Sequence, residues 1–123
     1  MRRIAVVIAI TLAVAACDSG PSGPGSILAR ATGPDVGGAL LEIRGTGIRG
    51  FAGRGSTRVY SAAVPDRPGV FRVVLVDPEG GDMGFDIQVD DRGMEGPAAT
   101  VISVAGTDNG LLPVADLMVR FER

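Results

Sequence analysis

Acidic side chains are the residues of this chain whose types and spacing come closest to doing chemistry. Six of them gather in one region, namely Asp77, Glu79, Asp82, Asp86, Asp90 and Asp91. Calcium needs six to eight oxygens around one point, but Asp86 and Asp90 would lie about 13 Å apart along a strand. Asp90 and Asp91 would point to opposite faces of a strand, so they cannot converge on a substrate as general acid and base. We therefore expect solubilising surface charge and no metal site.

The composition excludes the commonest catalytic side chains. The chain has no histidine and one cysteine, Cys17. A Ser–His–Asp triad, a Cys–His pair and the usual Cys/His zinc sites are therefore excluded. A glycosidase built from distant carboxylates would need a cleft, for which the domain is small. We expect no enzymatic activity and no cofactor.

The segment Gly45-Thr46-Gly47-Ile48-Arg49-Gly50 matches the GxGxxG fingerprint of dinucleotide-binding proteins. In that fingerprint a helix begins at the glycines, and its N-terminal amides bind a pyrophosphate. Here the next residues are Phe51-Ala52-Gly53-Arg54-Gly55, which cannot start a helix. We predict no nucleotide binding, and instead a glycine-rich loop with an irregular strand or a bulge.

Four arginines and one aromatic residue are spaced through this region and its flanks: Arg44, Arg49, Phe51, Arg54 and Arg58. Together they would form a basic surface for acidic glycans, lipid headgroups or a protein partner. The alternative is a solvated loop in a protein whose basic residues are all arginine. We keep these five residues as the candidate interaction loop.

The first 16 residues have the features of an export signal. Arg2 and Arg3 precede an apolar run from Ile4 to Ala16. As a helix this run would span about 20 Å at 1.5 Å per residue, which is short of the roughly 30 Å hydrocarbon core of a membrane. The following Asp18-Ser19-Gly20-Pro21 cannot continue an apolar helix. We expect a removable signal peptide rather than a transmembrane helix.

The stretch Leu12-Ala13-Val14-Ala15-Ala16-Cys17 resembles the lipobox of bacterial lipoprotein precursors. The resemblance implies cleavage between Ala16 and Cys17, a diacylglyceryl group on the Cys17 sulfur, and acylation of the new amine with chains such as palmitate. Two or three acyl chains give lasting membrane attachment, whereas one gives marginal binding. The alternatives are an ordinary signal peptide with a chance cysteine, and an uncleaved anchor. We expect a protein of the cell envelope, lipid-anchored to a bacterial membrane and facing the periplasm or the outside.

Cleavage would leave 107 residues, enough for one domain with a modest core. Residues 17–26 would carry the lipidated cysteine and a Gly/Pro/Ser-rich tether, and residues 27–123 the folded domain. All fourteen acidic residues but only ten of the twelve arginines follow Ala16, so this part has a net charge of −4. A mildly acidic domain argues against nucleic acid as a partner.

Glycine and proline recur so often after residue 26 that no stretch free of both exceeds ten residues. An average helix needs about 11 residues, so short strands are favoured. In Gly84–Asp90, Phe85, Ile87 and Val89 alternate with polar residues. Val70–Val76 is nearly all apolar, and we expect a central strand covered on both faces. The other expected strands are Ile27–Thr32, Ala39–Arg44, Ser56–Ala63, Ala98–Ala105 and Leu117–Phe121.

These segments predict an all-β fold, a small antiparallel β-sandwich of about seven strands preceded by a signal-peptide helix and a flexible tether. Turn-forming residues at 77–82 and 107–110 would link neighbouring strands. The last segment is ambiguous, because Leu117, Val119 and Phe121 alternate as in a strand while Val114, Leu117, Met118 and Phe121 sit at helical spacing. We favour the strand.

The strands Ala99–Ala105 and Leu117–Phe121 make the expected domain similar to small cohesin-like or immunoglobulin-like sandwiches of bacterial envelope lipoproteins. The chain is shorter than a cellulosomal cohesin, so dockerin binding and binding residues do not carry over. The resemblance implies a non-catalytic binding or interaction module whose partner is an envelope protein or a glycan. The alternative is a structural subunit of an envelope assembly.

Overall fold

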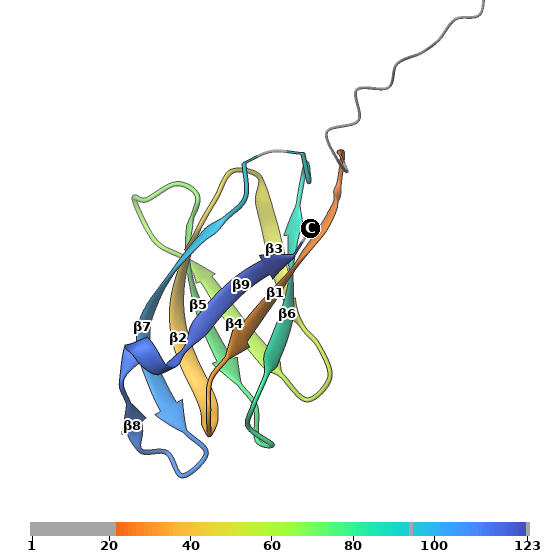
Figure 1. Cartoon of the computed structure of the whole chain (residues 1–123). Coiled ribbons are helices and arrows are strands. Elements are labelled where there is room, and N and C mark those ends of the chain that lie inside the picture. The colour runs from red at the N-terminus through yellow and green to blue at the C-terminus, as the bar shows by residue number, and fades with distance from the viewer. Residues whose placement is uncertain (1–21, 94, 123) are drawn as a thin grey trace, which may run out of the picture.

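The computed structural model describes residues 22–93 and 95–122, which form two antiparallel β-sheets packed face to face (Figure 1). Sheet A has the strand order β3-β6-β1-β9, and sheet B has the order β4-β5-β2-β7-β8. The strands are β1 (Gly25–Thr32), β2 (Val36–Arg44), β3 (Ile48–Gly53), β4 (Arg58–Ala63), β5 (Val70–Val76), β6 (Met83–Val89), β7 (Ala98–Gly106), β8 (Leu111–Leu112) and β9 (Met118–Glu122). The predicted all-β sandwich is confirmed.

Alternating apolar residues fill the space between the sheets. Phe85 and Ile87 of β6 are fully buried, whereas Asp86 between them lies on the outer face of sheet A. Across the core, Leu41 and Ile43 of β2 are also fully buried. Each such side chain contributes about 1.5–3 kcal/mol by leaving water. The period-two pattern of the sequence thus determines which side of each strand faces the core.

All seven expected strands are present, with ends shifted by up to two or three residues. The turn at residues 77–82 links β5 to β6, and its Gly80 and Gly81 have φ angles of 72° and 88°. The closing segment begins with a short 3-10 turn, η1 (Val114–Asp116), and continues as β9. The strand interpretation of that segment is therefore confirmed.

Three features differ from expectation. β3, where a glycine-rich loop with an irregular strand or a bulge was expected, and the two-residue β8 were not among the seven expected strands. β3 forms because its backbone pairs with β6, and its register shifts between Ile48 and Gly50 as in the predicted bulge. The expectation that Val70–Val76 is covered on both faces is wrong. Only one face of β5 is buried, because the apolar residues Val74 and Val76 lie on the outer surface of sheet B and each keeps 38% of its surface exposed.

The folded domain begins earlier than residue 27. β1 starts at Gly25, and just before it the Gly23 amide donates a hydrogen bond to Asp91 Oδ1 (2.9 Å) while the Arg92 amide donates to the Gly23 carbonyl (2.9 Å). Residues 1–21, which include the expected signal peptide, Ala16 and Cys17, lie outside the described residues. Within the described part of the chain, no helix is long and apolar enough to span a membrane.

Candidate functional site

Phe51, the aromatic residue of the candidate interaction loop, belongs to the edge of the core. It lies on β3 and packs edge-to-face against Phe71 of β5, with ring centroids 5.4 Å apart and planes at 68°. The contact joins the margin of sheet A to sheet B. Phe51 is half-buried and packs against the buried cluster between the sheets. Its ring therefore serves packing at this margin.

Arg49 and Arg54 pair with carboxylates of the neighbouring strand. Arg54 donates from Nε to both carboxylate oxygens of Asp86, at 2.9 and 3.0 Å. The Asp86 hydrogen bond and charge raise the pKa of the Arg54 guanidinium, so it stays protonated. Arg49 forms an ion pair with Asp90. Both positive charges are thus compensated within the chain.

Arg44 and Arg58 lie on the other sheet. Arg44 ends β2, where it borders a shallow depression together with Thr46 and Glu95. Arg58 begins β4, opposite Val76 of β5. The five residues of the candidate interaction loop are therefore divided between two sheets and form no single surface.

Asp77 is not the surface charge expected from the sequence, because it is 97% buried. Its carboxylate accepts hydrogen bonds from Ser56 Oγ (3.0 and 3.1 Å), Thr57 Oγ1 (3.1 Å) and the Glu79 amide (3.0 Å). These bonds join the end of β5 to the crossing from β3 to β4. Four polar contacts satisfy the buried carboxylate, so Asp77 has a structural role.

The remaining acidic residues are distributed over the surface. Asp86 and Asp90 pair with arginines, and Asp91 accepts hydrogen bonds from the Gly23 and Gly93 amides. Those two amides lower the pKa of Asp91. Among the described residues, no three His, Cys, Asp or Glu side chains lie close enough together to hold a metal ion.

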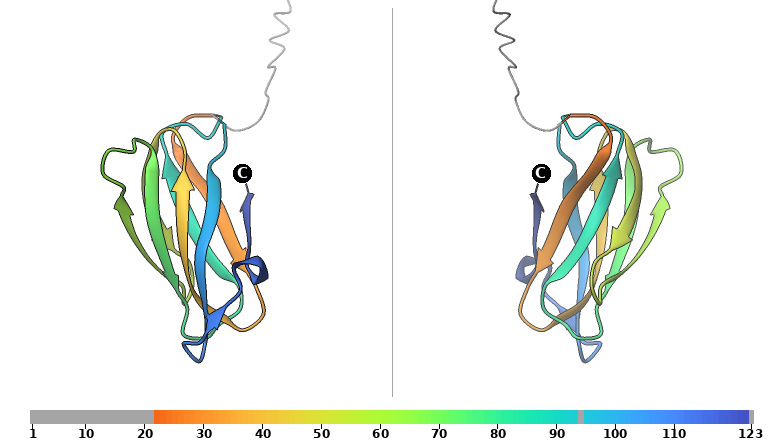
Figure 2. Two further views of the ribbon diagram at one scale, coloured as in Figure 1. Left: turned by 90° about the vertical axis from the view of Figure 1, so that its left-hand side faces the viewer. Right: turned by 90° about the vertical axis from the view of Figure 1, so that its right-hand side faces the viewer.

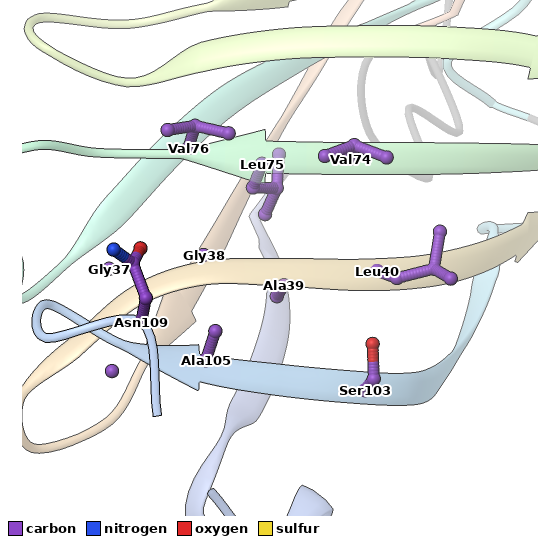
Figure 3. Close-up of a pocket in the computed structure, with 11 residues that line it drawn as sticks. Gly37, Gly38, Ala39, Leu40, Val74, Leu75, Val76, Ser103, Ala105 and Asn109 are labelled. Atoms are coloured by element: carbon purple, nitrogen blue, oxygen red, sulfur yellow. The ribbon is translucent and has the colours of Figure 1, made fainter. Parts of the chain in front are cut away.

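The strongest candidate site is a hollow of about 280 Å³ on the outer face of sheet B (Figure 3). Gly37 and Gly38 of β2 line it, and Gly38 has no side chain to fill the space beside Val76. Leu40 and Val74 bound it along the strands, and Val76 stands across from Gly38 in the β5–β2 register. The other lining residues are Ala39, Leu75, Ser103, Ala105, Gly106 and Asn109.

Tyr60 of β4 extends this apolar surface. It is opposite Val74 in the β4–β5 register and is 58% exposed. Toward the other end of the same face, Glu42 is only 9% exposed and pairs with Arg67 (2.8 Å) and Arg72 (3.8 Å). The outer face of sheet B therefore has an apolar part around Val74 and Val76, with exposed Arg58 opposite Val76 on one side and the Glu42 cluster on the other. Apolar side chains bordered by charged ones are common in protein-binding surfaces.

The sequence contained a weak signal for this hollow. Val74 and Val76 are each an even number of residues from Arg72, which must face solvent, so they should face solvent too. Gly38, opposite Val76, has no side chain to cover it. We instead interpreted the apolar run as a strand buried on both sides. The strand neighbours that bring Gly38, Val76 and Ala105 together are far apart in the chain.

Comparisons with protein-family models, curated proteins and solved structures found no match to this chain.

Proposed function

We propose that this protein is a lipid-anchored lipoprotein of a bacterial cell envelope whose β-sandwich acts as a non-catalytic protein-binding module. The anchor is proposed from the lipobox-like residues 12–17 and the apolar run before them. Lipidation of Cys17 would attach the chain close to the point where the folded domain begins, since Gly23 is already bonded to Asp91 and Arg92.

The apolar hollow on the outer face of sheet B is the observation that carries the binding role. Val74, Val76 and Tyr60 are large apolar side chains exposed beside it. Their contact with another protein would remove apolar surface from water, which favours association by about 25 cal/mol per Å² before the costs of binding. We propose that the occupant is an envelope protein presenting apolar side chains to the hollow.

The pairing of the arginines supports a protein over an acidic glycan. Binding an acidic ligand through Arg49 and Arg54 would require that it displace Asp90 and Asp86. The apolar hollow needs no such exchange. It is also smaller and more open to solvent than the enclosed sites that hold most small molecules, so a broad protein surface is the better match.

Site-specific photocrosslinking of the full chain in cells tests the binding role. A photoreactive residue at Val74 should capture one protein reproducibly, and the same residue at Gln88, on the outer face of sheet A, should not. Leu40→Asp, which places a charge in the hollow, should reduce the Val74 adduct at least tenfold. Equal capture from both sites, or none from Val74, would contradict the proposal.

The anchor is tested separately. Cys17→Ala removes the only sulfur to which lipid could be attached, so lipid labelling and retention in the membrane fraction should be lost. Cys17→Ser is the matched control that keeps the size of the side chain and should behave in the same way. Retention of both variants in the membrane would refute the lipidation.

A further inference from the structure

We propose that β4 is a self-pairing edge, through which two copies of this chain join their B sheets by antiparallel β4–β4 pairing. β4 is the outermost strand of sheet B (Figure 2), and no described strand pairs with its other side. From Val59 to Ala63 it carries no charge and no proline, and it pairs with β5 without a bulge. Such an edge is a ready template for another strand.

The other sheet margins carry features that oppose pairing. β3 is glycine-rich and bulged between Ile48 and Gly50. β9 bears Arg120 and Glu122 within five residues. On the far side of sheet B, β7 has a register shift where it pairs with β2, and β8 covers its end. Charges, bulges and covered ends are the usual protection of an edge strand; β4 from Val59 onward has none of them.

Alternation along β4 determines which backbone groups are free. The Val64 amide donates to the Val70 carbonyl (2.9 Å), so residues of the same parity, Tyr60 and Ala62, direct their N–H and C=O groups toward β5. On β5, the Asp77 amide donates to the Gly37 carbonyl of β2. Odd-numbered residues of β5 therefore bond to β2 and even-numbered ones to β4, which agrees with the assignment for Tyr60 and Ala62. The N–H and C=O groups of Val59, Ser61 and Ala63 therefore point to the free edge.

One antiparallel register uses all of these groups. With Ser61 opposite Ser61 of a second copy, Val59 lies opposite Ala63, and these pairs are the hydrogen-bonded ones. Each would exchange two hydrogen bonds, about six in total. In the same register the large Tyr60 lies opposite the small Ala62 of the second copy, and Val59 lies opposite the small Ala63. If one copy shifts along the other by two residues in either direction, Val59 or Ala63 lies opposite a residue outside β4, and hydrogen bonds between the two β4 strands are lost.

Charge does not oppose this register. Arg58 is the only charged residue of β4, and the two copies of it would lie at opposite ends of the joined strands, about 20 Å apart. Arg72, beside Ala62, is already paired with Glu42.

The inference does not rest on the lipid anchor. If both copies are anchored, their strands must lie along the membrane, because antiparallel pairing puts the two N-terminal ends at opposite ends of the dimer.

Cysteine crosslinking of the full chain in cells tests this register. Ser61→Cys places two thiols on the twofold axis, with Cα atoms about 5.5 Å apart, within the range of a disulfide. Mild oxidation should link most of this variant as a dimer. Thr100→Cys, also an exposed position but on β7, and the unsubstituted chain, which reports on Cys17, should form no disulfide-linked dimer. No dimer from Ser61→Cys, or equal dimer from Thr100→Cys, would overturn the proposal.

Two further measurements do not depend on the Ser61 thiol. Co-expressed Tyr60→Cys and Ala62→Cys chains should form a mixed disulfide at least fivefold more than Tyr60→Cys with itself, because only the mixed pair is directly opposite in this register. Light scattering of the unsubstituted chain in detergent should give the mass of a dimer, and Ser61→Pro, which removes a free-edge N–H, should give that of a monomer. A monomeric unsubstituted chain or a dimeric Ser61→Pro contradicts the pairing.

Discussion

The outer face of sheet A and the outer face of sheet B are built from the same alternating pattern but differ in what the solvent-facing residues do. On sheet A, Arg54 pairs with Asp86 and Arg30 pairs with Glu122 (3.3 Å). On sheet B, the apolar side chains of Val74 and Val76 remain exposed at a hollow (Figure 3). Tyr60, opposite Val74, is exposed as well. These charges of sheet A are paired within the chain, while Arg120 of β9 donates to the Met118 sulfur; part of the outer face of sheet B instead leaves apolar surface in water.

The two faces differ because the role of a side chain depends on its neighbours as well as on its type. The arginines are prominent in the sequence, but Arg49 and Arg54 are compensated by Asp90 and Asp86. The valines of β5 suggested burial, but only every second one is buried. Exposed paired charges add little stability and are well solvated, whereas exposed apolar residues gain from being covered. The candidate partner surface is therefore the apolar one.

The largest expected effect on the free energy of unfolding is at Leu41, on the side of β2 that faces the core. Leu41 faces the core and is fully buried, and its neighbour Leu40 faces the hollow. Leu41→Ala should lower the free energy of unfolding by about 2–5 kcal/mol, because it leaves a cavity. Leu40→Ala should lower it by about 1 kcal/mol or less while weakening capture of the partner. Chemical denaturation measures both, and similar losses for the two variants would mean that the outer face of sheet B is part of the packed core.

An intermediate effect is expected at the edge of sheet B. Ala62→Pro removes an N–H that faces β5 and leaves a carbonyl of β5 without a donor, which should cost about 1–3 kcal/mol. Ser61→Pro removes an N–H that faces solvent, where an edge strand tolerates proline, so its cost should be about 1 kcal/mol or less. Denaturation at low protein concentration compares them. The reverse order would show that the parity of β4 is opposite to that described.

The smallest effect concerns a carboxylate at the end of sheet A. The Gly93 and Gly23 amides lower the pKa of Asp91 below its ordinary value of 3.8. Its contribution to stability is therefore present above pH 3.8 and is lost as the pH falls through the lower, folded-state pKa. The difference in thermal unfolding between Asp91→Asn and the unsubstituted chain should be small above pH 3.8 and should shrink as the pH falls below it. A difference that grows as the pH falls would contradict this sign.

Much of the fold was predictable because it depends on local patterns. Phe85, Ile87 and Val89 alternate with polar residues, and all three are buried. The turn chemistry of residues 77–82 placed the link between β5 and β6 correctly. β3 was missed as a strand because its glycines have low strand propensity, and pairing with β6 overrides that preference. Of the candidate site, the sequence predicted one basic surface, but Arg49 and Arg54 lie at opposite ends of β3, and their pairing with Asp90 and Asp86 was not predicted.

The all-β sandwich and the inward face of most strands follow from local sequence patterns, because the period-two alternation and the turn residues act over a few positions. Which strands are neighbours depends on the tertiary structure. That choice divides Arg44 and Arg58 from Arg49 and Arg54, places Gly38 between Val76 and Ala105, and leaves β4 at a free edge. Strand neighbours follow from the packing of the whole core and from hydrogen bonds between segments far apart in the chain, so no local pattern encodes them.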